Sequence, residues 1–439
     1  MPSLTLKSSL RQKTARKSAS SKQPQEKKKI SSIPAARAAK PASAKKKHAG
    51  IDISSTRKTS APKNLKPSVL PSSGSSGAAF SNASPAVTRA LHRSSVPGLP
   101  LQKSVPYQLI CFGSATYDVF ITTQTELIEI KSPTTEESFI AYPSGSKIII
   151  KDLEFYTGGG GTNTACTFSA LGLSVGYVGI IGTDPTADLI KQELHQLGIA
   201  FLGKQKEGKT GFSVILDSFA HDRTILAYKG VNDNFEPGDF SVPQYPALWY
   251  YFSSLTGQAF TTFLEIVTTA SKQGIKCAFN PSSYLIKEKR AEILGILPNI
   301  TALIFNFEEA KLLLGYRTEE KLDPFMLLKQ LLSYGPTYVV ITDGANGLYA
   351  GTREHEFFVR IQPRKVRVVE STGAGDAFAS AFIGGLVLKK DFEYALLMGL
   401  TNAEGVIGMR GAKKGIRNLA QIQEIIKTQP VSVTKIKSP

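Results

Sequence analysis

After residue 106, hydrophobic residues follow two patterns, and segments of one pattern alternate along the chain with segments of the other. Short runs that are almost wholly apolar predict buried β-strands, and they lie at 109–112, 175–181, 249–252, 277–279, 302–305 and 338–342. Between them, apolar residues recur at helical spacing, which predicts helices at 161–171, 188–197, 258–273, 308–314, 324–333, 373–389 and 392–409. This alternation is typical of an α/β domain, in which helices cover both faces of a central, mostly parallel sheet.

Four further segments alternate apolar and polar residues one by one, at 119–123, 147–155, 212–217 and 224–228. Strands of this kind have one face open to something other than a hydrophobic core. We therefore expect a small β-sheet that projects from the main sheet, with its strands within about 119–155 and 211–229.

Charge separates the first 105 residues from the rest. They contain 21 of the 53 basic residues but only 2 of the 35 acidic ones, so the net charge of +18 comes from this segment. It is rich in Ser, Ala, Lys and Pro and has little to bury, which predicts a disordered basic tail. Residues 106–430 then form one nearly neutral domain, which excludes a uniformly basic nucleic-acid-binding fold, and 431–439 form a C-terminal tail.

Three functions are compatible with the composition of the tail. It can be an organelle transit peptide, a weak non-specific nucleic-acid tether or a solubilising segment. No stretch approaches the ~20 apolar residues of a membrane span, and three widely spaced cysteines fit a reducing compartment. We expect a soluble, cytoplasmic protein with no membrane contact, and organelle import stays open.

The strongest chemical signal is the segment VVESTGAGDAF at 368–378. A strand enters a glycine turn, and an alanine-rich helix leaves it. Amide groups at a helix start lack partners and carry partial positive charge, so those of Gly373, Ala374 and Gly375 can hold an anion. Asp376 can then accept a proton from a hydroxyl that attacks this anion, as in phosphoryl transfer. A helix start with an acidic first turn is an equally good interpretation of these four residues.

A second signal is the glycine-rich segment TGGGGTNTA at 157–165. Glycines allow a ligand to approach the backbone closely, and Asn163 offers both a donor and an acceptor to hydroxyl groups. A dinucleotide-binding fingerprint fits poorly, because the segment does not follow the first strand. A flexible turn would explain the glycines but not the Asn-Thr-Ala entry into a helix.

Three more polar loops follow predicted strands. Asp118, after the first strand, can bind neighbouring sugar hydroxyls or cap a turn. Asn306 and Glu309 can form a capping box or orient magnesium-bound water. The segment TDGANG at 342–347 can be a hairpin turn or a loop that contacts a nucleotide. All five loops lie beyond the carboxyl ends of strands, where open α/β sheets bind their ligands.

Five segments in this order, CFGSATYD, GGGGTNTA, NFEE, TDGANG and STGAGDAF, resemble the ribokinase-like (PfkB) carbohydrate kinase family over about 107–427. The resemblance implies a ribokinase-like three-layer fold with a small β-sheet lid. It also implies an enzyme that phosphorylates a sugar or sugar-like hydroxyl with ATP and Mg²⁺. Members of the family commonly dimerise through the lid, so a homodimer is expected as well.

The resemblance further implies roles for single residues. The catalytic base is Asp376, and the anion hole consists of the amides of Gly373, Ala374 and Gly375. The sugar-binding residues are Asp118, Gly159, Asn163 and, in the lid sequence DRT, Arg223. The nucleotide-binding residues are Asn306, Thr342, Gly344, Gly347, Asn402 and Gly411. Glu309 is expected to act on Mg²⁺ through water.

Three positions depart from the family pattern. Ribokinases usually carry Lys where this chain has Gly160 and Glu where it has Ser254, which argues against ribose as the acceptor. Glu370 replaces the usual Asp before the GAGD segment, so activation by a monovalent cation stays open. Two alternative functions remain: a nucleoside (adenosine-type) kinase of the same fold, and a nucleic-acid-tethered binding protein that acts through its basic tail.

Overall fold

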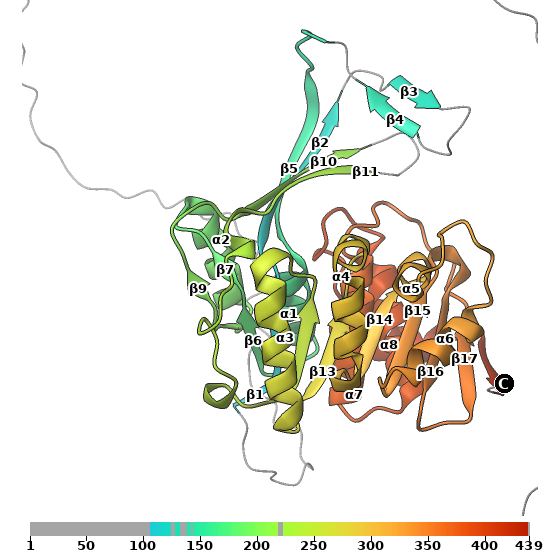
Figure 1. The fold of residues 1–439 in the computed structure, drawn as a ribbon. Helices are drawn as coiled ribbons and strands as arrows, with labels where there is room; N and C mark the ends of the chain where they lie inside the picture. Colours follow the sequence, from blue (N-terminus) through green and yellow to red (C-terminus); the bar gives the residue numbers. More distant parts are fainter. Residues whose placement is uncertain (1–105, 124–127, 132–137, 142–143, 218–222, 438–439) are drawn as a thin grey trace, which may run out of the picture. The chain divides into compact units, whose positions relative to one another are not determined.

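The protein is represented by a computed structural model that describes residues 106–123, 128–131, 138–141, 144–217 and 223–437 (Figure 1). The predicted basic tail at 1–105 lies outside the described residues. The backbone of Arg223 lies in a strand, but its side chain is also outside the description.

A central sheet forms the middle layer of the domain (Figure 1). Within the described residues it has ten strands, in the order β18-β17-β16-β15-β14-β13-β12-β1-β6-β8. Neighbours are parallel from β15 to β8, whereas β15, β16, β17 and β18 pair antiparallel. The strands are β1 (Tyr107–Phe112), β6 (Val175–Val178), β8 (Ala200–Phe201), β12 (Ala247–Ser253), β13 (Lys276–Asn280), β14 (Ala302–Asn306), β15 (Tyr338–Thr342), β16 (Leu348–Thr352), β17 (Phe357–Ile361) and β18 (Val433–Lys437).

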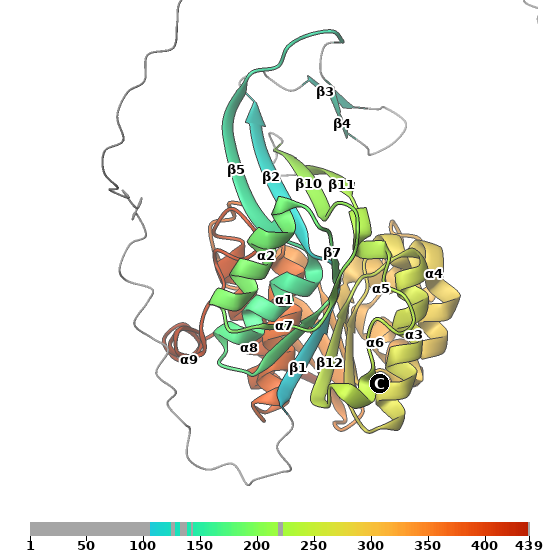
Figure 2. The same ribbon diagram turned by 90° about the vertical axis from the view of Figure 1, so that its left-hand side faces the viewer.

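Helices cover both faces of this sheet (Figures 1 and 2). One face packs against α3 (Gly257–Lys272), α4 (Ser283–Ile296), α5 (Phe307–Leu314) and α6 (Pro324–Ser333). The other packs against α1 (Gly160–Ala170), α2 (Pro185–Gln196), α7 (Ala374–Val387), α8 (Phe392–Val406) and α9 (Leu419–Thr428).

Successive side chains along a strand point to opposite faces of the sheet, and this alternation produces two hydrophobic cores. Ile110 and Phe112 of β1 point into the core on the α3 side, while Leu109 and Cys111 point into the core on the α1 side, and all four are at most 1% exposed. A strand that is buried on both faces must be apolar throughout. The predicted three-layer α/β fold is therefore confirmed.

Some elements differ from the prediction. The apolar run at 175–181 is divided, because β7 (Ile180–Ile181) leaves the main sheet to pair with β9 (Lys204–Gln205). The helices α4 and α9 and the strands β16 and β17 were not predicted. Residues 431–439 are not simply a tail, because β18 hydrogen-bonds to β17 as the edge strand of the main sheet.

A second sheet rises from the edge where β1 ends (Figure 2). It contains β2 (Thr116–Thr123), β5 (Ile150–Gly158), β10 (Gly211–Asp217) and β11 (Arg223–Tyr228), in the order β11-β10-β2-β5. A hairpin of β3 (Ile128–Lys131) and β4 (Ser138–Ala141) lies within the β2–β5 connection. This sheet is the predicted lid. Leu153, Phe155 and Leu226 remain exposed on it, and a dimer through the lid stays a prediction.

None of the helices in the described part of the chain is long and apolar enough to cross a bilayer.

Candidate active site

A polar cavity of about 360 Å³ lies at the carboxyl ends of β1, β12, β13, β14 and β15. Serine, glycine and asparagine form much of its lining, and its charged residues are Lys229, Glu309 and Asp376. An open α/β sheet binds ligands at this edge because the strands end there and their loops diverge. The predicted loops at 157–165, 306–309, 342–347 and 371–376 all contribute to this cavity or to its surroundings.

Helix α7 begins at the wall of the polar cavity. Its N-cap is Gly373, whose φ of +77° lies in the left-handed region that favours glycine. A Cβ at this position would lie 2.5 Å from the Cβ of Ala412, so the backbone at residue 373 packs directly on the loop that follows α8. Gly373 and Gly375 both line the cavity.

Not all three amides of the predicted anion hole are free to bind an anion. The N–H of Ala374 already donates to the carbonyl oxygen of Ser371 at 3.2 Å. Gly375 is exposed at the second position of the helix, where an N–H has no partner within the helix. The amide of Gly375 is therefore the best placed of the three to hold an anion.

Asp376 is held in the first turn of α7 by a contact from the glycine-rich segment. Asn163 Nδ2, in α1, donates a hydrogen bond to Asp376 Oδ2 at 2.9 Å. Burial raises the pKa of Asp376 to about 6, the bond from Asn163 opposes this rise, and the carboxylate of Glu309 adds to it. A carboxylate with this pKa is unprotonated at neutral pH yet basic enough to accept a proton during a reaction.

A second, largely apolar cavity of about 470 Å³ adjoins the first. The two share Thr342, Ser371 and Gly375, so the α7 amide lies where they meet. The apolar cavity is bounded by the β15–β16 connection, by the segment 363–368 and by α8. A ligand in the apolar cavity can therefore extend past Gly375 toward Asp376.

The segment at 342–347 is the predicted hairpin turn, and nucleotide contact by it stays a prediction. It connects the antiparallel strands β15 and β16, with Thr342 paired to Leu348, and it lines the apolar cavity through Thr342, Gly344 and Gly347. The φ of Gly347 is +96°, and a Cβ there would lie 2.0 Å from the carbonyl oxygen of Ile361. This close approach requires glycine.

Asn306 and Glu309 form the predicted capping box at the start of α5. Asn306 Oδ1 accepts from the amide of Glu309 at 2.8 Å, and Glu309 Oε2 accepts from the amide of Asn306 at 2.9 Å. Glu309 Oε1 accepts from Ser283 Oγ at 3.0 Å. Burial raises the pKa of Glu309, while these hydrogen bonds oppose the rise. Both residues line the polar cavity, so capping does not remove them from it.

Asp118 and Asn163 each present a buried acceptor without a partner. Asp118 lies in β2 and is 7% exposed, Asn163 is 6% exposed, and neither Asp118 Oδ1 nor Asn163 Oδ1 has a hydrogen-bond partner among the described residues. An unpaired buried acceptor is unfavourable unless a ligand satisfies it. Burial also raises the pKa of Asp118, against hydrogen bonds from Thr116 and Ser213.

Five of the predicted site residues whose side chains are described line neither cavity: Asp118, Gly159, Asn163, Asn402 and Gly411. Gly159 has a φ of +96° and packs on Ser114, where a Cβ would meet a carbonyl oxygen at 2.4 Å. Gly411, with a φ of +85°, packs against the ring of Tyr156 in the lid. Asn402 is fully buried, donates to the carbonyl of Ala377 and accepts from the amide of Arg417, both at 2.9 Å. These bonds tie α8 to α7 and to the segment at Arg417, and nucleotide binding by Asn402 stays a prediction.

Other residues of the two cavities carry no sequence signal. Arg364 and Glu404 form a buried ion pair of 2.8 Å at the apolar cavity, and Lys229 lines the polar one. They belong to segments without motifs and come together only through the fold. Glu370 accepts from the amide of Thr372 at 2.7 Å, and a role for a monovalent cation there stays a prediction.

Comparison with known proteins agrees with this geometry. A profile of the pfkB family carbohydrate kinases matches residues 109–418. The 5-dehydro-2-deoxygluconokinase of Bacillus subtilis (strain 168) is 26% identical over 291 residues, which cover 62% of this chain and 87% of that protein. Because the family profile spans well over half of the chain, the chain belongs to the pfkB family of carbohydrate kinases.

Solved structures show the same fold. Ribokinase from Cryptococcus neoformans var. grubii serotype A, in complex with ADP, matches with a TM-score of 0.59 at 23% identity and covers 73% of this chain and 99% of that one. The nucleoside kinase of Methanocaldococcus jannaschii matches with a TM-score of 0.58 at 17% identity, with 73% and 98% covered. The expected ribokinase-like fold and the expected class of enzyme, a carbohydrate kinase, are confirmed.

Proposed function

We propose that this carbohydrate kinase transfers the terminal phosphoryl group of ATP to a hydroxyl of a sugar or sugar-like alcohol, with Asp376 as the general base. The observation that carries the proposal is the position of Gly375 at the junction of the two cavities, with Asp376 next to it in the polar one. The apolar cavity suits a nucleotide, and the polar one suits an acceptor with several hydroxyl groups.

Two buried oxygen atoms that lack hydrogen-bond partners among the residues that the structure describes orient the sugar that receives the phosphoryl group. Hydroxyl groups of a sugar donate to Asp118 Oδ1 and Asn163 Oδ1, which satisfies both. The reacting hydroxyl faces Asp376, whose carboxylate takes the proton as the oxygen–phosphorus bond forms. The bond between the terminal phosphorus and ADP breaks, and ADP carries away its electron pair while the amide of Gly375 stabilises charge on the phosphoryl group.

The residues around the polar cavity fit magnesium held through water. Mg²⁺ usually keeps several waters and takes one or two carboxylates together with substrate phosphates. Among the described residues no group of three metal-binding side chains occurs, but Glu309 and Asn306, whose side chains carry oxygen atoms, both line the cavity. Bound Mg²⁺ would neutralise phosphate charge, and these two residues would hold it through its waters.

A panel of acceptors tests the proposal. The purified chain, ATP and Mg²⁺ are incubated with hexoses, ribose, sugar acids or adenosine, and ATP consumption is measured. We expect at least one sugar or sugar acid to raise consumption well above the rate with water alone. A response to adenosine alone would favour the nucleoside kinase alternative, and no response to any acceptor would contradict the proposal.

The pH dependence of kcat/KM should report the protonation of Asp376 in the free enzyme. Since the base must be unprotonated, we expect kcat/KM to fall as the pH drops through about 6. Asn163→Leu removes the hydrogen bond that lowers the pKa of Asp376, so the fall in activity on the acid side of the pH profile should move to higher pH. Glu309→Gln keeps the capping geometry but removes a negative charge that raises the pKa, so this fall should move to lower pH. Shifts of both variants in one direction would contradict the assignment to Asp376.

A further inference from the structure

Lys229 is a positively charged residue in the lining of the polar cavity. The other charged residues in the lining are Glu309 and Asp376, so Lys229 is the only cation among the described residues that line it. It is exposed, and its Nζ has no hydrogen-bond or ion-pair partner within the described part of the chain. An ammonium group without a protein partner, on a flexible side chain at the wall of a ligand cavity, is available to a ligand.

The backbone of Lys229 is fixed at one end of the cavity. Lys229 directly follows β11 and precedes the short 3₁₀ helix η1 (Gly230–Asp233). Asn232 Nδ2 donates to the carbonyl of Lys229 and to that of Ala115, and Asn232 Oδ1 accepts from the amide of Ala115, all at 3.0 Å. Because Ser114, next to Ala115, lines the cavity, these bonds tie Lys229 to the β1 end of its wall.

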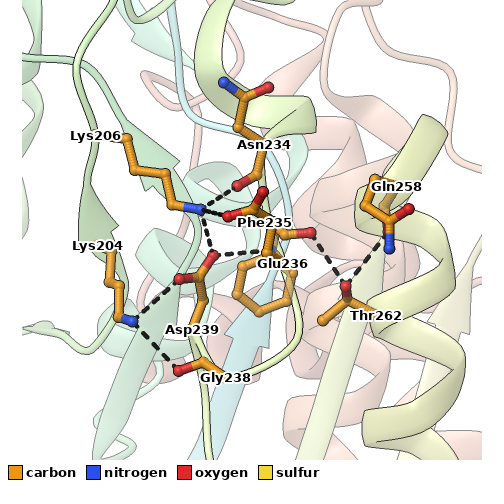
Figure 3. Close-up of polar contacts among 9 residues, drawn as sticks. All are labelled: Lys204, Lys206, Asn234, Phe235, Glu236, Gly238, Asp239, Gln258 and Thr262. Carbon is orange, nitrogen blue, oxygen red and sulfur yellow. Dashed lines mark hydrogen bonds and ion pairs between the residues drawn. The ribbon is translucent and has the colours of Figure 1, made fainter.

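The chain after η1 is also held firmly. Asp233 Oδ1 accepts from Thr256 Oγ1 at 2.7 Å. Figure 3 shows the next residues bound to Lys206, which follows β9, and to α3: Lys206 pairs with Glu236 at 2.7 Å and with Asp239 at 2.8 Å, and Thr262 Oγ1 donates to the carbonyl of Phe235 at 3.1 Å. With both ends anchored, Lys229 is presented from a fixed position.

That position is at the acceptor end of the cavity rather than at the phosphate end. Lys229 is tied to the loop after β1, and the serines in its part of the wall, Ser114, Ser253 and Ser254, come from β1 and β12. The loop after β15, which lines the apolar cavity together with Gly375, follows a strand that lies three positions away from β12 in the sheet order.

We propose that Lys229 binds a carboxylate on the acceptor, so that the preferred substrate is a sugar acid. This inference rests on the proposed function. An anionic acceptor that enters a cavity containing Glu309 and Asp376 needs a compensating cation, because unpaired charges in a confined site are unfavourable. A neutral sugar needs only the hydroxyl and amide groups of the wall. The cation therefore discriminates between these two classes of acceptor.

Matched pairs of acceptors test the inference, for example gluconate with glucitol and 2-ketogluconate with fructose. For wild-type protein we expect kcat/KM to be at least about tenfold higher for the acid, because a charge-assisted hydrogen bond distinguishes the pair. Lys229→Met should lower kcat/KM for the acid by about 10- to 100-fold. The values for the neutral partner and the KM for ATP should stay unchanged. Lys229→Arg should retain most of the preference, and Lys272→Met, at an exposed position of α3, should have no effect.

The outcomes separate the inference from the function on which it rests. If the wild type phosphorylates neutral sugars as well as their acids, or if Lys229→Met changes both alike, Lys229 does not select a carboxylate. A raised KM for ATP in Lys229→Met would show that it binds phosphates instead, which also overturns the inference. If neutral and acidic acceptors all fail with the wild type, the proposed function fails as well. Added salt should weaken the preference for the acid in wild type but not in Lys229→Met.

Discussion

Asp376→Asn is expected to lower kcat by about 10²- to 10⁴-fold, the range for loss of a general base. The amide is nearly isosteric with the carboxylate and can still accept the hydrogen bond that Asn163 Nδ2 now gives to Asp376 at 2.9 Å. The start of α7 should therefore keep its geometry. Turnover is measured with the best acceptor from the panel, and nucleotide affinity is measured by calorimetry.

Nucleotide affinity is the internal control for this variant. The apolar cavity is lined by other residues, so binding of ATP should stay close to that of wild type. Turnover within a few-fold of wild type would remove Asp376 from the mechanism. A large loss of nucleotide binding would instead show that the substitution had disturbed the α7 turn.

Gly373→Ala should lower kcat by about 10²- to 10³-fold, the range for loss of one donor to a developing negative charge. An added Cβ would lie 2.5 Å from Ala412 Cβ and 2.9 Å from Ala412 Cα, and the second of these is backbone. The turn must therefore shift and carry the amide of Gly375 away from its position. The measurement is kcat under saturating acceptor and ATP.

Gly172→Ala is the matched control for this second variant. Gly172 has a φ of +82°, close to the +77° of Gly373, but a Cβ there would have no neighbour within 4 Å. Both variants carry left-handed strain of roughly 1–2 kcal/mol, and only Gly373→Ala adds the clash beside the cavity. Equal losses of kcat in the two variants would mean that the effect comes from stability and not from the anion hole.

The sequence identified most of the machinery because it lies in continuous segments. The GAGD turn supplies its N-cap, its amides and Asp376 within four residues, so a local pattern contains the whole unit. The Asn306–Glu309 capping box and the 342–347 loop are local in the same way. In each case the backbone geometry follows from neighbouring residues, and the chemistry follows from the geometry.

Contacts between distant segments were not predictable from the sequence. The hydrogen bond from Asn163 to Asp376 joins the starts of α1 and α7, and the packing of Ala412 on Gly373 joins the loop after α8 to the start of α7. Asn402 matched a nucleotide-binding position, yet the structure places it in the interior, where its amide bonds to Ala377 and Arg417. A sequence pattern records which residue is present but not which way its side chain points.

By itself the sequence determined the layered α/β fold, the lid, the family and the glycine turn at the start of α7, because hydrophobic periodicity and glycine-bearing turns act over a few residues at a time. Only the tertiary structure decided that two cavities meet at Gly375, that residues near the C-terminus complete the sheet as β18, and that Lys229 lines the polar cavity. Those features depend on where parallel strands end relative to one another, which is set by long-range pairing and packing.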